Sequence, residues 1–110
     1  MSVFVVHPIN DKGVDISAAK VYGELSFINP RYIYIDELSD GDLPTDYRSK
    51  MMKVVDQWDP EEDYLLIAGD HLQIIAMSAL LAARWGVFMA LRYDRQAKGY
   101  AVANIETRDA

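Results

Sequence analysis

The sequence of 110 residues contains no cysteine. This absence excludes disulfide bonds, thiolate nucleophiles, cysteine-ligated zinc sites and iron–sulfur clusters, and it favours the cytoplasm over an oxidising compartment. The first residues, MSVFVVHPIND, lack the basic start and long apolar stretch of a signal peptide. The most apolar segment, residues 72–85, is too short to cross a bilayer. We therefore expect a cytoplasmic protein with no membrane partner.

An excess of positive charge is also lacking, because the formal net charge is −6. Direct binding to nucleic acid is not expected, since it depends on a cationic surface. The charge is uneven: residues 36–63 carry ten acidic and three basic residues, and residues 84–98 carry four basic residues and one acidic residue. Solvated loops and helix faces explain this pattern. Two alternatives are a contact between the acidic part of one molecule and the basic part of another, and an acidic decoy of a nucleic-acid-binding protein.

The signatures of several common enzyme classes are missing as well. The sequence contains no G-x-x-x-x-G-K-[ST] phosphate loop and none of the motifs G-x-G-x-x-G, H-E-x-x-H and G-x-S-x-G. It indicates no cofactor, no metal and no catalytic residue. The sequence therefore favours a non-catalytic protein, although it does not decide the question.

The spacing of apolar residues predicts an α/β fold in a single domain over residues 1–110. Strands are expected at residues 2–6, 64–68, 87–93 and 100–105, and helices at 46–58, with Thr45 as N-cap, and at 70–85, ended by Gly86. The strand, helix and strand within residues 64–93 form a βαβ unit, and the last two strands form a hairpin. We predict a small layered fold with a mixed sheet of four or five strands.

Residues 15–35 give a less regular pattern. Asp15 or Ser17 is expected to cap a short helix that runs through Tyr22. Two β-like runs follow, at residues 24–28 and 32–35, and Asn29-Pro30-Arg31 separates them. Because proline cannot donate to the ladder of a central strand, either the two runs form a hairpin or only the second is a strand.

The tripeptide Gly69-Asp70-His71 joins a predicted strand to a predicted helix. Asp70 is suited to cap the helix, and Gly69 allows the chain to turn. This position is also where α/β sheets bind ligands, beyond the carboxyl ends of parallel strands. If strand 2–6 lies parallel beside strand 64–68, His7 and Asn10 reach the same edge. The candidate ligand-binding residues are then His7, Asn10, Gly69, Asp70 and His71, and a phosphate-bearing anion is the candidate ligand.

The helix at residues 70–85 is apolar almost all round. Ile74, Met77 and Leu81 share one side with its polar residues, and the opposite side carries Leu72, Ile75 and four alanines, which would permit close approach to a sheet. The second side needs another cover. That cover is either the preceding helix or another polypeptide, and in the second case Ile74, Met77 and Leu81 form the centre of a homodimer interface.

Two functional hypotheses follow from these patterns. The first is a non-catalytic binding or regulatory protein that acts through self-association, as a homo-oligomer, or by docking on another macromolecule, such as a protein partner. The second is a small enzyme or ligand-binding domain with an anionic ligand at the carboxyl edge of the sheet.

Overall fold

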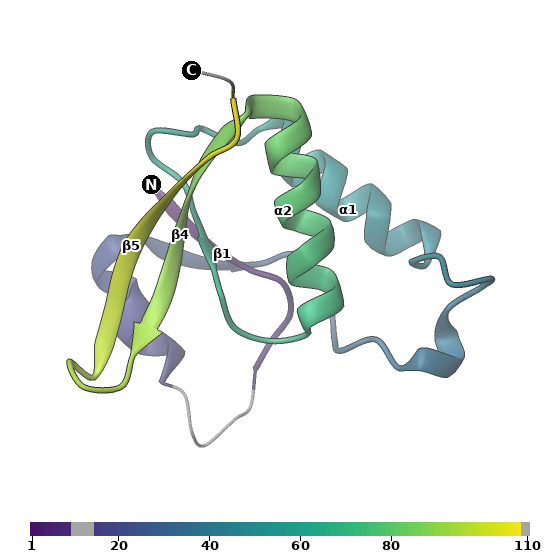
Figure 1. Cartoon of the computed structure of the whole chain (residues 1–110). Helices are drawn as coiled ribbons and strands as arrows, with labels where there is room; N and C mark the ends of the chain where they lie inside the picture. Colours follow the sequence, from purple (N-terminus) through teal and green to yellow (C-terminus); the bar gives the residue numbers. More distant parts are fainter. Residues whose placement is uncertain (10–14, 109–110) are drawn as a thin grey trace.

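The computed structural model describes residues 1–9 and 15–108 (Figure 1). One five-stranded sheet has the order β2-β1-β3-β4-β5. The strands are β1 (Ser2–Val5), β2 (Glu24–Phe27), β3 (Tyr64–Leu66), β4 (Val87–Asp94) and β5 (Gly99–Glu106). β1 is parallel to β2 and β3, β3 is parallel to β4, and β4 and β5 form an antiparallel hairpin. The predicted α/β class, mixed sheet and C-terminal hairpin are therefore confirmed.

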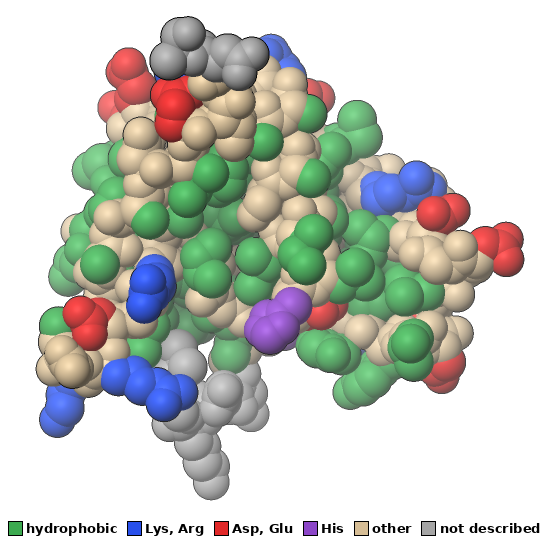
Figure 2. Space-filling model, viewed as in Figure 1, with side chains coloured by type: hydrophobic (Ala, Val, Ile, Leu, Met, Phe, Trp, Pro, Cys, Tyr) green, Lys and Arg blue, Asp and Glu red, His purple; other side chains and the backbone are tan. Residues whose placement is uncertain are grey.

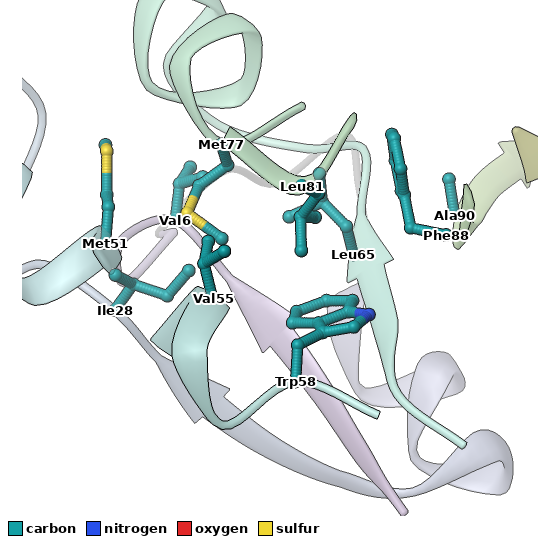
Figure 3. Packing of buried hydrophobic residues seen from close by; sticks show 10 residues of the cluster. All are labelled: Val6, Ile28, Met51, Val55, Trp58, Leu65, Met77, Leu81, Phe88 and Ala90. Carbon is teal, nitrogen blue, oxygen red and sulfur yellow. The ribbon is translucent and has the colours of Figure 1, made fainter. Parts of the chain in front are cut away.

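The two faces of the sheet have different covers. The helices α1 (Thr45–Asp56) and α2 (His71–Trp85) pack on one face, and the 3-10 helix η1 (Ile16–Tyr22) packs on the other. Strand alternation divides the core between them, because successive side chains of a strand point to opposite faces. On the side of α1 and α2 the core consists of Val6, Ile28, Met51, Val55, Trp58, Leu65, Met77, Leu81, Phe88 and Ala90 (Figure 3). On the side of η1 it consists of Val3, Val5, Ala19, Leu66, Leu91 and Tyr100.

Local chemistry sets both ends of α2. The Asp70 carboxylate accepts a hydrogen bond from the Leu72 backbone N–H at 3.1 Å, and Gly86 ends the helix in the left-handed region with φ of 77°. The expected βαβ unit of β3, α2 and β4 is present. The cap predicted for α1 is wrong, because Thr45 is already helical and Pro44 occupies the N-cap position without a side-chain hydrogen bond.

Residues 24–35 differ from both predicted alternatives. The first β-like run forms β2 and pairs parallel with β1, whereas residues 32–34 are not a strand and Ile35–Glu37 form a short 3-10 helix, η2. The parallel pairing continues past β2, since the backbone N–H groups of Ile28 and Asn29 donate to Val5 and Val6. It stops at Pro30, which has no N–H to donate. Both alternatives were wrong, because the first run is the strand and its partner, β1, lies far earlier in the chain.

The orientation of α2 is the reverse of the predicted one. Met77 and Leu81 are fully buried between the sheet and α1, and Ile74 packs against the same core. The opposite side, with Leu72, Ile75 at 64% exposure and Ala79, faces solvent. Met77 and Leu81 fill the space between the sheet and α1. The smaller alanines of the opposite side would leave a cavity there.

The cover of Ile74, Met77 and Leu81 therefore comes from the chain itself. Their neighbours in the core include Met51, Val55 and Trp58, from α1 and the residues after it. Of the two predicted covers, the preceding helix is the one present. The interface centred on Met77 and Leu81 is wrong, because neither side chain retains any exposed surface.

Candidate functional site

His7 lies beside the turn into α2 at the carboxyl edge of the sheet. The parallel pairing of β1 with β3 brings it there, as predicted. The Asp70 backbone N–H donates to His7 Nε2 at 2.9 Å, and His7 Nδ1 lies 2.8 Å from the Pro8 carbonyl oxygen. Since a carbonyl only accepts, Nδ1 carries the proton and Nε2 is the acceptor. Both ring nitrogens are thus engaged in holding the chain.

A buried polar network continues from Asp70 into the protein. Gln73 Nε2 donates to the second Asp70 oxygen at 3.3 Å and to the Arg31 carbonyl oxygen at 3.0 Å. Gln73 Oε1 accepts from Asn29 Nδ2 at 3.0 Å. Asn29, Asp70 and Gln73 are all buried. Sequence reasoning missed Asn29 and Gln73 as members of this cluster, although the spacing of Gln73 three residues after Asp70 on one helix face is a usable signal.

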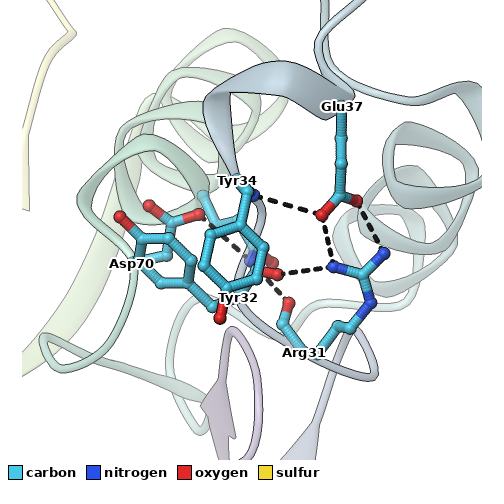
Figure 4. Close-up of polar contacts among 6 residues, drawn as sticks. Arg31, Tyr32, Tyr34, Glu37 and Asp70 are labelled. Carbon is cyan, nitrogen blue, oxygen red and sulfur yellow. Dashed lines mark hydrogen bonds and ion pairs between the residues drawn. The ribbon is translucent and has the colours of Figure 1, made fainter.

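The loop from Arg31 to Glu37 lies against this network (Figure 4). Two hydrogen bonds of 2.6 Å join the Arg31 guanidinium to the Glu37 carboxylate. These bonds hold the pKa of Glu37 below its ordinary value. Between the two charged residues the loop exposes Tyr32, Tyr34 and Ile35. The Tyr32 ring stands edge-on to His7, with centroids 6.0 Å apart.

The predicted site residues are only partly brought together. His7, Gly69 and Asp70 meet, whereas the His71 side chain is exposed and, within residues 1–9 and 15–108, makes no hydrogen bond or ion pair. Asn10 lies outside the described residues. Among the residues that are described, no group of three or more potential ligands is arranged to hold a metal ion.

The start of α2 is poorly suited to an anionic ligand. Asp70 places its own carboxylate at the helix N-terminus, where it already accepts from Leu72 and Gln73. The partial positive charge of the helix end is therefore used within the chain, and a second anion would meet a negative neighbour. These contacts indicate a structural role for the cluster.

Gly69 gives a direct test of that structural role. Its φ is 106°, and a Cβ added to it would lie 3.0 Å from His7 Nε2 and 3.1 Å from Val6 Cγ2. We expect Gly69→Ala to lower the free energy of unfolding by about 2 kcal/mol, from backbone strain and crowding against the His7 ring. Urea denaturation measures the effect. Gly41→Ala is the matched control, because its φ is also positive, at 83°, but nothing lies within 4 Å of the added Cβ.

A hollow of about 580 Å³ lies at the tip of the β4–β5 hairpin. It is lined by Arg92, Tyr93, Asp94, Arg95, Gln96 and Ala101. None of these residues is buried, so the hollow lacks the enclosed apolar walls of a ligand pocket. The Asp94 carboxylate accepts from the backbone N–H groups of Gln96 and Ala97, which stabilises the turn.

A second region of interest is the uncharged surface formed by α2 and β5. Phe88 and Ala90 of β4 point toward α2, and their partners across the hairpin are Ile105 and Ala103. Directly paired residues of antiparallel strands project to the same face, so the outer part of β5 lies beside α2 on the helical side of the sheet. We call this surface the open face and define it as Leu72, Ile75, Ala79, Ala101, Ala103 and Ile105.

These features define a small α/β protein with a five-stranded mixed sheet and a buried polar cluster at its carboxyl edge. The chain belongs to the family of phage Pam3 gp32-like proteins, whose family model matches residues 1–107. Neither a curated protein nor a solved structure matches the chain. Across the part of the chain that the structure describes, no helix has the length and apolar character needed to cross a membrane.

Proposed function

We propose that this protein is a non-catalytic binding protein of the cytoplasm that acts through self-association as a homodimer. The observation that carries the proposal is the open face. Apolar side chains gather over α2 and the neighbouring hairpin in the space-filling view (Figure 2). Contiguous exposed apolar surface of this kind is typical of sites that bind another protein surface.

The low charge of the open face strengthens this proposal: Arg92, which pairs with Ala101 and is exposed, lies only at its margin. The solvent side of a surface helix ordinarily carries charged residues. On α2 this side instead carries Leu72, Ile75, Ala79 and Ala83, all of which are exposed. The adjoining residues of β5 are two alanines and Ile105. Burial of these side chains against a second chain would remove apolar surface from water, which is the main driving force of association.

The polar cluster gives less support to the competing function of an anion-binding domain. Its histidine uses both ring nitrogens within the chain, and its aspartate occupies the helix N-terminus. Catalysis would require a polar group that is free to contact a substrate. Self-association requires no such group.

Docking on another macromolecule is a second candidate, and the loop from Arg31 to Glu37 favours it. Ile35 is 86% exposed and lies next to the exposed Tyr34. Tyrosine is frequent at the energetic centres of protein interfaces. The ion pair of Arg31 with Glu37 holds the loop in place, so these side chains are presented on a supported backbone.

Sedimentation velocity of the complete chain over a range of concentrations tests self-association. We expect the wild-type protein to sediment at twice the mass of one chain, and Ile105→Lys to weaken the dimer by roughly tenfold or more, because a charge is buried in the apolar contact. Ile35→Lys is the control, since Ile35 is more exposed but lies outside the open face. A single-chain mass at every concentration would contradict the proposal. Dissociation by the control variant instead would assign the contact to the loop.

A further inference from the structure

We infer that the free edge of β5 pairs antiparallel with β5 of a second copy, so that the sheet continues across a twofold axis. This inference rests on the proposed self-association and places its hydrogen bonds at the edge of β5, where Ala101 of one copy lies opposite Ala103 of the other and the two open faces adjoin. The proposed partner of this edge is a second copy of the chain, because the edge of β5 is complementary to itself in shape, hydrogen bonding and charge.

The edge of β5 lacks the usual protection of an outer strand. β5 is the last strand in the sheet order and has eight residues. An exposed strand edge offers unpaired N–H and C=O groups to other chains, and proteins commonly block it with lysine, proline or a short strand. β5 contains neither lysine nor proline, and Glu106, its last residue, is its only charged one. The opposite edge strand, β2, has only four residues.

The register of the hairpin shows which backbone groups of β5 point away from β4. The Thr107 N–H donates to the Gly86 carbonyl oxygen, in line with the pairing of β4 and β5. The Leu91 carbonyl oxygen accepts from Ile67 on the other side of β4, so its partner Val102 is not bonded to β4 at that position. Hydrogen bonding alternates along an antiparallel pair. The backbone groups of Tyr100, Val102 and Asn104 therefore point away from β4, toward the outer edge. The Tyr100 carbonyl oxygen already accepts from the Tyr22 hydroxyl of η1 at 2.8 Å, so only its second lone pair is open to another donor.

A twofold axis through Val102 satisfies these groups in both copies. Val102 then pairs with Val102 of the second copy, and Tyr100 pairs with Asn104 on either side. Val102 is 47% exposed in the single chain, so a β-branched apolar side chain at the centre of the contact becomes covered. Cross-strand pairs of apolar β-branched side chains stabilise sheets.

The same register is complementary in charge. Lys98 precedes the first residue of β5, and Glu106 is its last residue. The antiparallel pairing brings Lys98 of each copy to the end of the neighbouring strand that carries Glu106. Ile105 also falls opposite Gly99, where no side chain opposes it. A peptide of unrelated sequence would not reproduce this agreement.

Cysteine cross-linking tests the pairing directly, because the natural chain contains no cysteine. In the proposed register the two Val102 Cα atoms lie roughly 5.5 Å apart, within the range that a disulfide spans. We expect Val102→Cys to form a covalent dimer in most of the protein under mild oxidation. Ile35→Cys is the control, since Ile35 is 86% exposed in η2, outside the edge, and should remain largely uncross-linked.

A charge at the same position gives an independent readout. Val102→Lys places two like charges opposite each other at the axis, and we expect the dimer to weaken on the order of 100-fold in sedimentation velocity. Ile35→Lys, in η2 and outside the edge, should leave the dimer unchanged. Circular dichroism checks that each variant is folded, and if Val102→Lys does not fold, the cross-linking yield decides the question.

The outcomes separate this inference from the proposed function. A dimeric wild-type protein whose Val102→Cys variant fails to cross-link overturns the β5 pairing but leaves self-association standing. Persistence of the dimer in folded Val102→Lys also overturns the pairing. A wild-type protein that is a single chain at every concentration overturns both. Cross-linking at Val102 together with dissociation by lysine supports the pairing.

Discussion

Replacing Leu81 by alanine should lower the free energy of unfolding by about 3 kcal/mol, because the change leaves a cavity in the buried core. Leu81 has no exposed surface and lies in the core with Met77, Val55 and Leu65. The rigid sheet below and α1 beside it leave little freedom for the site to collapse. Urea denaturation followed by far-ultraviolet circular dichroism measures the loss.

Ile75→Ala is the matched control on the same helix. Ile75 loses a similar volume, but it is 64% exposed on the open face. We expect its free energy of unfolding to stay within about 0.5 kcal/mol of the wild-type value, as is usual for surface substitutions. Both variants are measured at a protein concentration at which the chains do not associate, because Ile75 belongs to the open face and its replacement would otherwise change the contribution of association. A larger loss for Ile75→Ala than for Leu81→Ala would mean that α2 presents its alanine side to the core.

The elements of the fold could be predicted where short-range chemistry determines them. Asp70 caps the start of α2, and Gly86 ends it in the left-handed region; both residue types are recognised signals in the sequence. The uninterrupted apolar character of Tyr64 to Ala68 is typical of a strand covered on both faces, and β3 is central in the sheet. The short spacing between β4 and β5 likewise predicts their hairpin.

The orientation of α2 could not be predicted, because a helix that is apolar almost all round has no single apolar face to follow. Its polar residue Gln73 suggested an outer side. In the structure Gln73 is buried, and its side chain bonds to Asn29 and Arg31. These partners lie 44 and 42 residues earlier in the chain. Such distant partners leave no periodic signal. The same limitation applies to β2, whose register depends on pairing with β1.

The position of the polar cluster was predictable, but the roles of its members were not. Parallel pairing of β1 with β3 is enough to bring His7 to Asp70. Whether an imidazole is free to bind a ligand depends on the groups that face its two nitrogens. Those groups are the Pro8 carbonyl and the Asp70 N–H, and their directions follow from the turns at both strand ends.

Gln73→Leu should also lower the free energy of unfolding, by about 3 kcal/mol, although it increases the apolar character of the core. Leucine has nearly the volume of glutamine, so the change creates no large cavity. It removes the partners of the Asn29 amide and the Arg31 carbonyl, which glutamine satisfies through one amide group. Buried polar groups without partners are costly, and this cost should exceed the gain from the apolar side chain. Urea denaturation measures the difference.

Ser78→Ala is the control, because Ser78 makes one hydrogen bond to the Ile74 carbonyl within α2 and no contact with a distant buried polar group. Its loss should change stability by less than about 1 kcal/mol. A Gln73→Leu variant as stable as the wild type would mean that the network adds nothing to the stability given by the apolar core.

Hydrogen exchange distinguishes a local effect of Gln73→Leu from a global one. Gln73 bonds to the Arg31 carbonyl at the start of the loop that ends at Glu37, so amide exchange in that loop should accelerate more in Gln73→Leu than in Leu81→Ala at equal loss of stability.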